Sequence, residues 1–402
     1  MAMKRIYEAV LQEHVESLRQ MAFLTGPRQV GKTTSCQTLA DQGRYVNWDN
    51  QGHRAIILKG ADEVASALKL HQLEQLKPVI VFDEIHKYSK WKNFLKGFFD
   101  EYGQKSSIIV TGSSRLDVYK RGGDSLMGRY FPYRMHPLSL AELTSTNLSE
   151  RGIQSPQRPS PETLERLLVF GGFPEPFLRA ENRFSTRWKR LRGEQLVRED
   201  IRDITRIQDI GQLETLMQSL AAQAGQLVNY TTLANRINTS VDTIRRWLGA
   251  LQSFYFCFEV RPWSRNVAKS LRKQPKLYLW DWSLVTAEGG ARFENLVASH
   301  LLKGVHWWTD RGLGNFGLYF LRDKLGREVD FLVTKDNTPW FLVEAKSGGG
   351  KDLNPALAYF QNQIGAGHAF QVAAHLEFVD RDCFEHTSPL IVPTATFLSQ
   401  LV

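Results

Sequence analysis

Residues 23–34 read FLTGPRQVGKTT, an apolar run that ends in a loop bounded by glycines. The spacing G-x-x-x-x-G-K-T is that of a P-loop, in which glycines let backbone N–H groups curl around a phosphate. Lys32 would meet the β- and γ-phosphate oxygens, and the Thr33 hydroxyl would hold Mg²⁺. The alternative is a glycine-rich turn that fits by chance, but the strand expected before the loop and the helix expected to open at Lys32 favour the P-loop. The predicted cofactors are therefore ATP and Mg²⁺.

Residues 78–86, PVIVFDEIH, predict a buried strand that delivers two carboxylates to its carboxyl end. Asp83 would hold the Mg²⁺ through water, and Glu84 would polarise the attacking water as a general base. Two acidic residues can also simply end a strand. Their combination with a P-loop favours the pattern known as Walker B.

A third group of candidates follows the strand predicted in residues 107–115, SIIVTGSSR. Neighbouring parallel strands converge at their carboxyl ends, so Ser113 or Ser114 could sense the γ-phosphate, with ordinary turn serines as the alternative. The predicted nucleotide-binding residues are Gly26, Arg28, Gly31, Lys32, Thr33, Thr34, Asp83 and Ser113, with Thr33 and Asp83 as metal ligands.

Arg129 stands just before a strand predicted within residues 128–143, GRYFPYRMHPLSLAEL. From this position it could reach the phosphate held by a neighbouring subunit, as an arginine finger does. Arg115 and Arg134 compete for the role, and a plain surface arginine is the further alternative.

Helical spacing of apolar residues in 6–19 and 58–73, and a short strand at 44–48, complete a predicted P-loop core of residues 1–150. A polar loop at 144–162 marks its edge. Residues 151–212, in which a helix runs into a Gly-Gly-Phe-Pro turn, predict a helical lid.

Residues 213–263 predict a winged helix, with an amphipathic helix, two further helices joined at 238–240, and a wing at 254–263. Arg245 and Arg246 would face outward where a helix-turn-helix meets the major groove. Such modules also serve as protein–protein contacts, and that alternative stays open.

The chain has 402 residues, 42% of them hydrophobic, and a formal net charge of +9. This length predicts two to four domains, and the positive charge favours a polyanionic partner, nucleic acid before membrane. The three cysteines are too few for a disulfide framework. We found no apolar run of membrane-spanning length and no secretory leader, and we expect a cytoplasmic protein. The predicted DNA-binding residues are Arg245, Arg246, Arg265, Lys269, Arg272 and Lys273, the last four from the basic stretch 261–276.

Residues 264–402 predict alternating strands and short helices, including strands at 304–309 and, as the last one, 368–375. Four charged residues stand out: Glu294, Asp330, Glu344 and Lys346. Glu344 and Lys346 alternate on a strand and share a face, which can hold a metal and a cation together. An acid and a lysine on an exposed strand face are the alternative.

In their order, GPRQVGKTT, VIVFDEIH, IIVTGSS and GRYFPYRMHPLSLAEL resemble the AAA+-type ATPases of bacteria and archaea that carry a restriction-nuclease-like domain at the C-terminus. The resemblance spans nearly the whole chain. It implies a PD-(D/E)XK nuclease fold in residues 264–402, with Asp330 and Glu344 as Mg²⁺ ligands, Lys346 as the cation that activates water, and Glu294 as an accessory carboxylate. The chain departs from the motif because Val329, and not proline, precedes Asp330.

The predicted architecture is an α/β P-loop core with a parallel sheet, a helical lid, a winged helix and a restriction-endonuclease-like domain. The predicted function is an ATP-dependent DNA-processing enzyme. A homo-oligomeric ring, such as a hexamer, would hydrolyse ATP, and a Mg²⁺-dependent endonuclease would cut branched DNA such as four-way junctions. One rival is a DNA-binding regulatory switch with a degenerate nuclease domain. Another is a defence effector that degrades nucleic acid.

Overall fold

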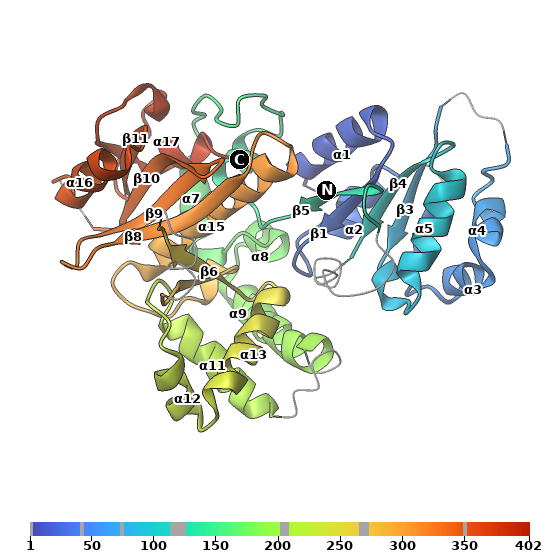
Figure 1. The fold of residues 1–402 in the computed structure, drawn as a ribbon, viewed down its shortest axis with the longest axis horizontal. Coiled ribbons are helices and arrows are strands. Elements are labelled where there is room, and N and C mark those ends of the chain that lie inside the picture. The colour runs from blue at the N-terminus through green and yellow to red at the C-terminus, as the bar shows by residue number, and fades with distance from the viewer. Residues whose placement is uncertain are drawn as a thin grey trace. The chain divides into compact units, whose positions relative to one another are not determined.

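The computed structural model describes residues 3–40, 44–72, 76–112, 126–201, 209–264, 273–348 and 352–402. The chain forms two compact units (Figure 1). Unit 1 is Met1–His136 with Thr146–Leu148, and unit 2 is Pro137–Ser145 with Ser149–Val402.

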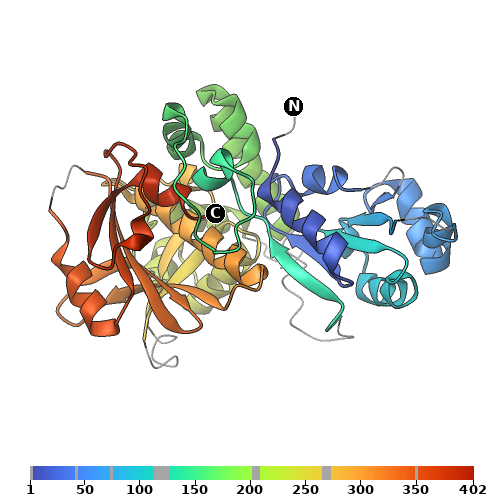
Figure 2. The ribbon, with the colours of Figure 1, turned by 90° about the horizontal axis from the view of Figure 1, so that it is seen from above.

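Unit 1 is built on a five-stranded parallel sheet, as the sequence predicts. Its strands are β1 (Met21–Thr25), β2 (Tyr45–Asn47), β3 (Val79–Asp83), β4 (Ser107–Thr111) and β5 (Tyr130–Arg134), in the order β2-β3-β4-β1-β5. The edge strand β5 is teal in Figure 2. Because all five strands run the same way, their carboxyl ends share one edge of the sheet, where P-loop and Walker B residues can meet.

The helices of unit 1 are α1 (Ile6–Ser17), α2 (Lys32–Gln37), α3 (Gln51–Lys59), α4 (Ala61–Ala67), η1 (Ile85–Lys87) and α5 (Trp91–Tyr102). Alternate strand residues pack with α3, α4 and α5 in one buried cluster, whereas α1 and α2 contact the sheet outside it. The helix predicted at 58–73 is confirmed only in part, because α4 lies within this range but residues 58 and 59 belong to α3. The chain breaks at Gly60, whose φ of 116° ends α3 and starts α4.

Unit 2 is built on a seven-stranded mixed sheet. The strands are β6 (Cys257–Pro262), β7 (Lys276–Leu279), β8 (Phe316–Arg322), β9 (Glu328–Lys335), β10 (Thr338–Lys346), β11 (His368–Ala373) and β12 (Leu390–Pro393), in the order β12-β11-β10-β9-β8-β6-β7. Strands β8, β9 and β10 form an antiparallel meander, and β11 and β12 continue from β10 in parallel.

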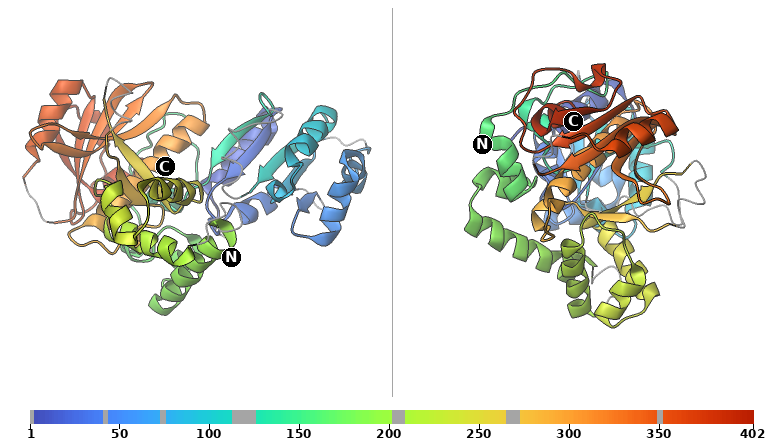
Figure 3. Two further views of the ribbon diagram at one scale, coloured as in Figure 1. Left: turned by 60° about the horizontal axis from the view of Figure 1, so that its bottom comes forward. Right: turned by 90° about the vertical axis from the view of Figure 1, so that its left-hand side faces the viewer.

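The helices of unit 2 are α6 (Leu140–Thr144), α7 (Pro161–Phe170), α8 (Pro174–Arg179), α9 (Asn182–Gln195), a π-helical turn η3 (Leu196–Ile201), α11 (Ile210–Ala222), α12 (Tyr230–Ile237), α13 (Val241–Ser253), η4 (Trp282–Leu284), α15 (Ala291–Asp310), α16 (Pro355–Ile364), η5 (Cys383–Glu385) and α17 (Thr394–Ser399). Helices α11, α12 and α13 gather into one group, yellow-green in Figure 3, around the buried Ile244, Trp247 and Leu251. Asn238 takes a left-handed conformation between α12 and α13, and the Ser240 hydroxyl caps α13.

Two expectations for the C-terminal part are wrong. Residues 304–309 are helical and not a strand, because α15 continues to Asp310. There the indole N–H of Trp308 donates to the Gly152 carbonyl over 2.6 Å and its ring packs on Trp340, so tertiary contacts override strand propensity. Strand β12 and α17 also follow the strand that was expected to be the last.

The division into units differs from the four predicted domains. Helix α6 falls in unit 2 and not in a core of residues 1–150, because the buried Lys303 of α15 donates to Ser139 and pairs with Glu142. The stretch predicted as a wing supplies β6, which pairs with β7 and, through β8, joins the large sheet. In the described residues, no helix is both long enough and apolar enough to cross a membrane.

Candidate functional site

The P-loop links β1 to α2 at the carboxyl edge of the unit 1 sheet, and α2 begins at Lys32 as predicted. Gly26 has a φ of 149°, and a Cβ placed there would lie 2.4 Å from the Met135 carbonyl oxygen. Gly31 has a φ of 106° at the start of the helix. Both positions therefore require glycine, which explains their place in the motif.

Lys32 is folded back onto its own loop. Its Nζ donates to the carbonyls of Gly26 over 2.8 Å and Pro27 over 2.7 Å. Burial lowers the pKa of this lysine to about 8, because few charges compensate for the loss of water. The ammonium is thus held at the loop, where a phosphate would replace the carbonyls as its partner.

Thr33 and Asp83 meet as the sequence predicts. The Thr33 hydroxyl donates to Asp83 Oδ2 over 3.1 Å, the Tyr45 hydroxyl bonds the same oxygen, and burial raises the pKa of the carboxyl. The other oxygen, Oδ1, is buried and accepts no hydrogen bond from any residue that the structure describes. A carboxylate with a free acceptor beside a hydroxyl matches the oxygen donors that Mg²⁺ takes, so these residues fit the ion.

Glu84 follows Asp83 in a left-handed conformation, with a φ of 56°. Its Oε2 lies 3.1 Å from Lys87 Nζ, and the same ammonium lies 2.6 Å from Asp49 Oδ2. The carboxylate proposed as a general base is therefore ion-paired here. Lys87 was missed in the sequence because nothing in its local pattern marks a lysine three residues beyond a Walker B strand.

The structure describes only some of the other residues predicted for the unit 1 site. Ser113, Ser114 and Arg115 lie outside the described residues, whereas Arg28 and Thr34 are exposed on the P-loop side. The buried Thr111 at the end of β4 has a hydroxyl without a hydrogen-bond partner among the described residues. It is therefore a sensor candidate that the sequence interpretation passed over in favour of the serines after it.

Arg129 lies at the opposite edge of the sheet from the P-loop. Its carbonyl accepts from the N–H of Met21, the first residue of β1, and its guanidinium forms two hydrogen bonds to Asp100, of 2.8 and 3.0 Å. Five strand residues, about 15 Å, separate this edge from the loop after Thr25. Arg129 therefore lies about one strand length from the P-loop of its own unit.

Arg5 is a support residue that the sequence did not indicate. Its buried guanidinium donates to the carbonyls of Val30, inside the P-loop, and of His136 over 2.7 Å. It thereby ties the loop to the chain after β5. An arginine just before a helix carries no signal of this role.

In unit 2 the structure brings Glu294 of α15, Asp330 of β9, and Glu344 and Lys346 of β10 together. The backbone N–H of Asp330 donates to Glu344 Oε2 over 3.4 Å, and that of Ala345 donates to Asp330 Oδ2 over 3.1 Å. Lys346 Nζ lies 2.6 Å from Glu344 Oε1. The predicted residues thus converge on one cluster.

Lys276 of β7, which the sequence interpretation did not assign to this cluster, is buried within it. Its Nζ lies 2.6 Å from Glu328 Oε1, 3.1 Å from Asp330 Oδ1 and 3.5 Å from Glu294 Oε1. Burial alone would lower the pKa of this lysine, but the surrounding carboxylates raise it above the usual value. Burial and Asp330 raise the pKa of Glu294 to about 7.

The metal prediction for Asp330 and Glu344 fits this cluster poorly. Within the described ranges, no group of three or more His, Cys, Asp or Glu side chains is arranged to hold a metal ion. Both oxygens of Asp330 and both of Glu344 already accept from protein donors. The cluster therefore differs from Asp83, which keeps an acceptor free.

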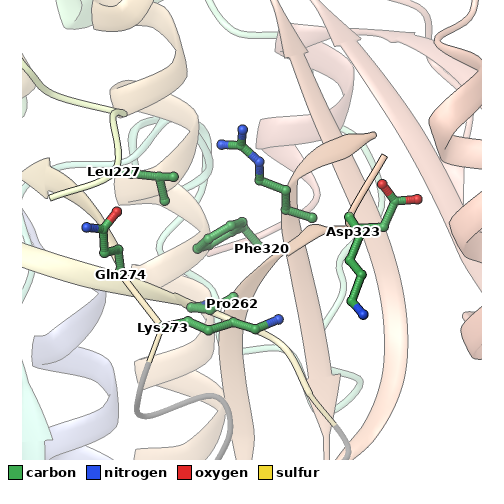
Figure 4. A pocket seen from close by; sticks show the side chains of 8 residues that line it. Leu227, Pro262, Lys273, Gln274, Phe320 and Asp323 are labelled. Atoms are coloured by element: carbon green, nitrogen blue, oxygen red, sulfur yellow. The ribbon is translucent and has the colours of Figure 1, made fainter. Parts of the chain in front are cut away.

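The predicted DNA-binding residues that the structure describes are Arg245, Arg246 and Lys273, and all three are exposed; Arg265, Lys269 and Arg272 lie outside the described residues. Lys273 lines a pocket of about 590 Å³ with the exposed Arg322 and Lys324. Figure 4 shows the Phe320 ring in this pocket near Leu227 and Pro262. The pocket thus combines three cations and the carboxylate of Asp323 with an apolar surface.

Comparison with known proteins supports an AAA-type ATPase in unit 1. Residues 18–144 match the family model described as "AAA domain", whereas 161–294 and 289–389 match two domains of unknown function, DUF8612 and DUF4143. An uncharacterized protein of Mycobacterium tuberculosis is 23% identical over 338 residues, which cover 79% of this chain and 71% of the relative. One of Haemophilus influenzae is 24% identical over 241 residues, 57% of this chain and 58% of the relative.

Among solved structures, AMPPCP-bound DnaA from Aquifex aeolicus is similar with a TM-score of 0.32 and 12% identity, over 61% of this chain and 86% of that one. A STAND protein from Pyrococcus horikoshii, which carries a tetratricopeptide repeat sensor, has a TM-score of 0.31 and 11% identity, over 78% of this chain and 48% of that one. Both likenesses are too distant to assign an activity.

Proposed function

We propose that unit 1 binds ATP with Mg²⁺ at the carboxyl edge of its sheet and hydrolyses it. The observation that carries this proposal is the buried Asp83 Oδ1, which keeps a free acceptor beside the Thr33 hydroxyl, in the described part of the chain. When bound, Mg²⁺ neutralises phosphate charge and orients the oxygens of the γ-phosphate. The AAA domain match over residues 18–144 supports the same function.

In this function each residue has a separate task. Lys32 exchanges the Gly26 and Pro27 carbonyls for phosphate oxygens, which restores a charged partner to its buried ammonium. Glu84 accepts the proton of the attacking water after it separates from Lys87. Lys87 keeps a carboxylate when Glu84 leaves, because Asp49 lies only 2.6 Å from its Nζ.

Unit 2 binds nucleic acid in this proposal. Arg245 and Arg246 are exposed at the start of α13, and Lys273, Arg322 and Lys324 surround the pocket shown in Figure 4. With a net charge of +9, the chain favours a polyanion, and exposed arginines and lysines neutralise phosphates. The helix-turn-helix helices α12 and α13 support DNA over a small anion.

The finer hypothesis is Mg²⁺-dependent cleavage of branched DNA such as four-way junctions. The convergence of Glu294, Asp330, Glu344 and Lys346 supports cleavage, but the satisfied carboxylate oxygens and the buried Lys276 oppose it. We therefore favour an ATP-dependent DNA-binding switch whose nuclease-like domain holds DNA without cutting it. The same argument weighs against a nucleic-acid-degrading defence effector.

Oligomerisation completes the proposal. Arg129 lies one strand length from the P-loop of its own unit, so a role in hydrolysis requires a second copy. Arg129 would leave Asp100 and reach the γ-phosphate of the neighbouring subunit, and a ring satisfies this need for every copy.

The experiment that tests this function measures ATP hydrolysis by the full chain with and without DNA. We expect hydrolysis by the wild type, none by Lys32→Ala, and wild-type rates for Lys59→Ala, which removes an exposed lysine from α3. Equal hydrolysis by the wild type and Lys32→Ala would refute the ATPase assignment. In parallel, labelled linear, forked and four-way DNA with ATP and Mg²⁺ should be bound and remain intact on a denaturing gel.

A further inference from the structure

Lys276 lies among the carboxylates of unit 2 for which the sequence predicts a metal site. It belongs to β7, and its side chain is only 6% exposed. It meets Asp330 of β9, 54 residues further along the chain, and also contacts Glu294 of α15 and Glu328. One ammonium therefore joins three elements of the unit.

The oxygens of the predicted ligands are already occupied. Asp330 Oδ1 accepts from Lys276, and its Oδ2 accepts from the backbone N–H of Ala345. Glu344 Oε1 accepts from Asn354 over 2.8 Å and lies beside Lys346. A cation would have to compete with these donors, and the Lys276 ammonium would repel it.

Tyr278, two residues after Lys276 on β7, supports the same conclusion. Its buried hydroxyl donates to Glu294 Oε1 over 2.7 Å, so the accessory carboxylate is also held by a protein donor. The strand therefore contributes one cation and one hydroxyl to the cluster. Both are built into a strand that pairs with β6, and this limits how far they can move.

We propose that Lys276 is a resident cation that replaces the divalent metal, so that the cluster of Glu294, Glu328, Asp330 and Glu344 binds no metal ion and ties β7 to β9 and α15. Unit 2 then has no metal to activate water for phosphodiester hydrolysis. This inference goes beyond the ATPase function and is independent of it, because every residue involved belongs to unit 2.

The proposal predicts that one substitution, Lys276→Met, creates a metal site. Lys276→Met keeps most of the apolar stem and removes the charge, which leaves four carboxylates with Lys346 beside Glu344 and Arg322 beside Glu328. Asp330 Oδ1 and Glu294 Oε1 then each lose an ammonium partner. The variant should therefore acquire a divalent cation site that the wild type lacks.

The test is titration of Mn²⁺ into the full chain, followed by calorimetry and by the electron paramagnetic resonance of free Mn²⁺. All proteins carry Asp83→Asn, which disables the proposed metal site of unit 1. We expect no Mn²⁺ site in Asp83→Asn, one new site in Asp83→Asn with Lys276→Met, and its loss when Asp330→Asn is added. Asp83→Asn with Lys303→Met is the matched control, because it removes another buried lysine of unit 2 and should create no site.

Two results would overturn the proposal. One is a Mn²⁺ site in Asp83→Asn that Asp330→Asn abolishes, since the wild-type cluster would then hold a metal. This first result is obtained with Lys276 unchanged. It therefore tests the proposal even when circular dichroism shows that the Lys276→Met protein does not fold. The other is a folded Lys276→Met protein that binds no Mn²⁺. Neither depends on ATP hydrolysis, which the Lys32 variant tests separately.

Discussion

The hydroxyl of Thr33 donates to Asp83 Oδ2 over 3.1 Å and joins two residues that are 50 positions apart in the chain. Thr33 lies at the start of α2 and Asp83 at the end of β3, so the bond closes the carboxyl edge of the sheet around one site. Asp83 Oδ1 is buried and accepts no hydrogen bond from the described residues. This edge of unit 1 is where the chemistry of the chain is expected to occur.

Glu84→Gln should separate ATP binding from hydrolysis. Glutamine keeps the shape of the side chain but cannot accept the proton of the attacking water, so we expect hydrolysis to fall by about 10²–10⁴-fold. ATP binding should persist, because Lys32 and Asp83 are unchanged. Filter binding of labelled ATP together with phosphate release measures both. Glu63→Gln, an exposed change on α4, is the control and should behave as wild type.

ATP binding should take up a proton at alkaline pH. Burial lowers the pKa of Lys32 to about 8 in the free protein, so at pH 9 most molecules carry a neutral lysine. The phosphates favour the charged form, and binding therefore restores the proton, nearly one per ATP at pH 9 and far less at pH 7. Affinity should weaken as pH rises through 8. Calorimetry in buffers of different ionisation enthalpy measures the uptake, and an absence of uptake at pH 9 would contradict the prediction.

Arg5→Met should destabilise unit 1. The substitution keeps the apolar stem but leaves the carbonyls of Val30 and His136 without their charged donor. A buried acceptor that loses its partner costs about 1–3 kcal/mol, so we expect the free energy of unfolding to fall by roughly 2–4 kcal/mol. Urea denaturation measures it. Arg19→Met, an exposed change beside Phe99, should shift the free energy far less.

Arg245→Glu and Arg246→Glu should each weaken DNA binding and reduce its dependence on salt. Each arginine that neutralises a phosphate contributes about one unit to the slope of log K against log salt concentration, so each variant should lose roughly that amount. Fluorescence anisotropy over a series of salt concentrations measures the slope. Arg190→Glu, on the exposed side of α9, is the control. Unchanged slopes for both variants would favour a protein partner for α12 and α13.

The unit 1 site could be predicted because its signals are local. The P-loop and the Walker B strand each carry their glycines, lysine and carboxylates within about ten residues, and a parallel sheet brings strand ends together whatever its details. The break at Gly60 was the main error there, since a helical pattern continues across it. A local pattern predicts the presence of a helix or strand more reliably than it predicts the residue at which the helix or strand ends.

The unit 2 site could be predicted only in part. Asp330, Glu344 and Lys346 fall on two strands joined by a short turn, and their meeting follows from that hairpin. Lys276 falls within the domain predicted for residues 264–402, but the sequence interpretation counted it with the basic stretch 261–276 and not with the carboxylates. Its role depends on β6 joining the large sheet through β8, a long-range pairing that no local pattern reveals.

The Arg129→Ala protein should not hydrolyse ATP by itself. Part of the activity should return when it is mixed with the Lys32→Ala protein. In its own unit Arg129 pairs with Asp100 at the edge away from the P-loop, so we expect its effect on hydrolysis to act on a neighbouring copy. In a mixture, Lys32→Ala subunits supply the arginine and Arg129→Ala subunits supply an intact P-loop, and an arginine finger is worth on the order of 10³-fold or more. Asp100→Asn is the control, because it frees Arg129 without removing it and should keep or raise the rate. A mixture no more active than the sum of its parts, or an Arg129→Ala protein as active as wild type, would mean that Arg129 serves only its pair with Asp100.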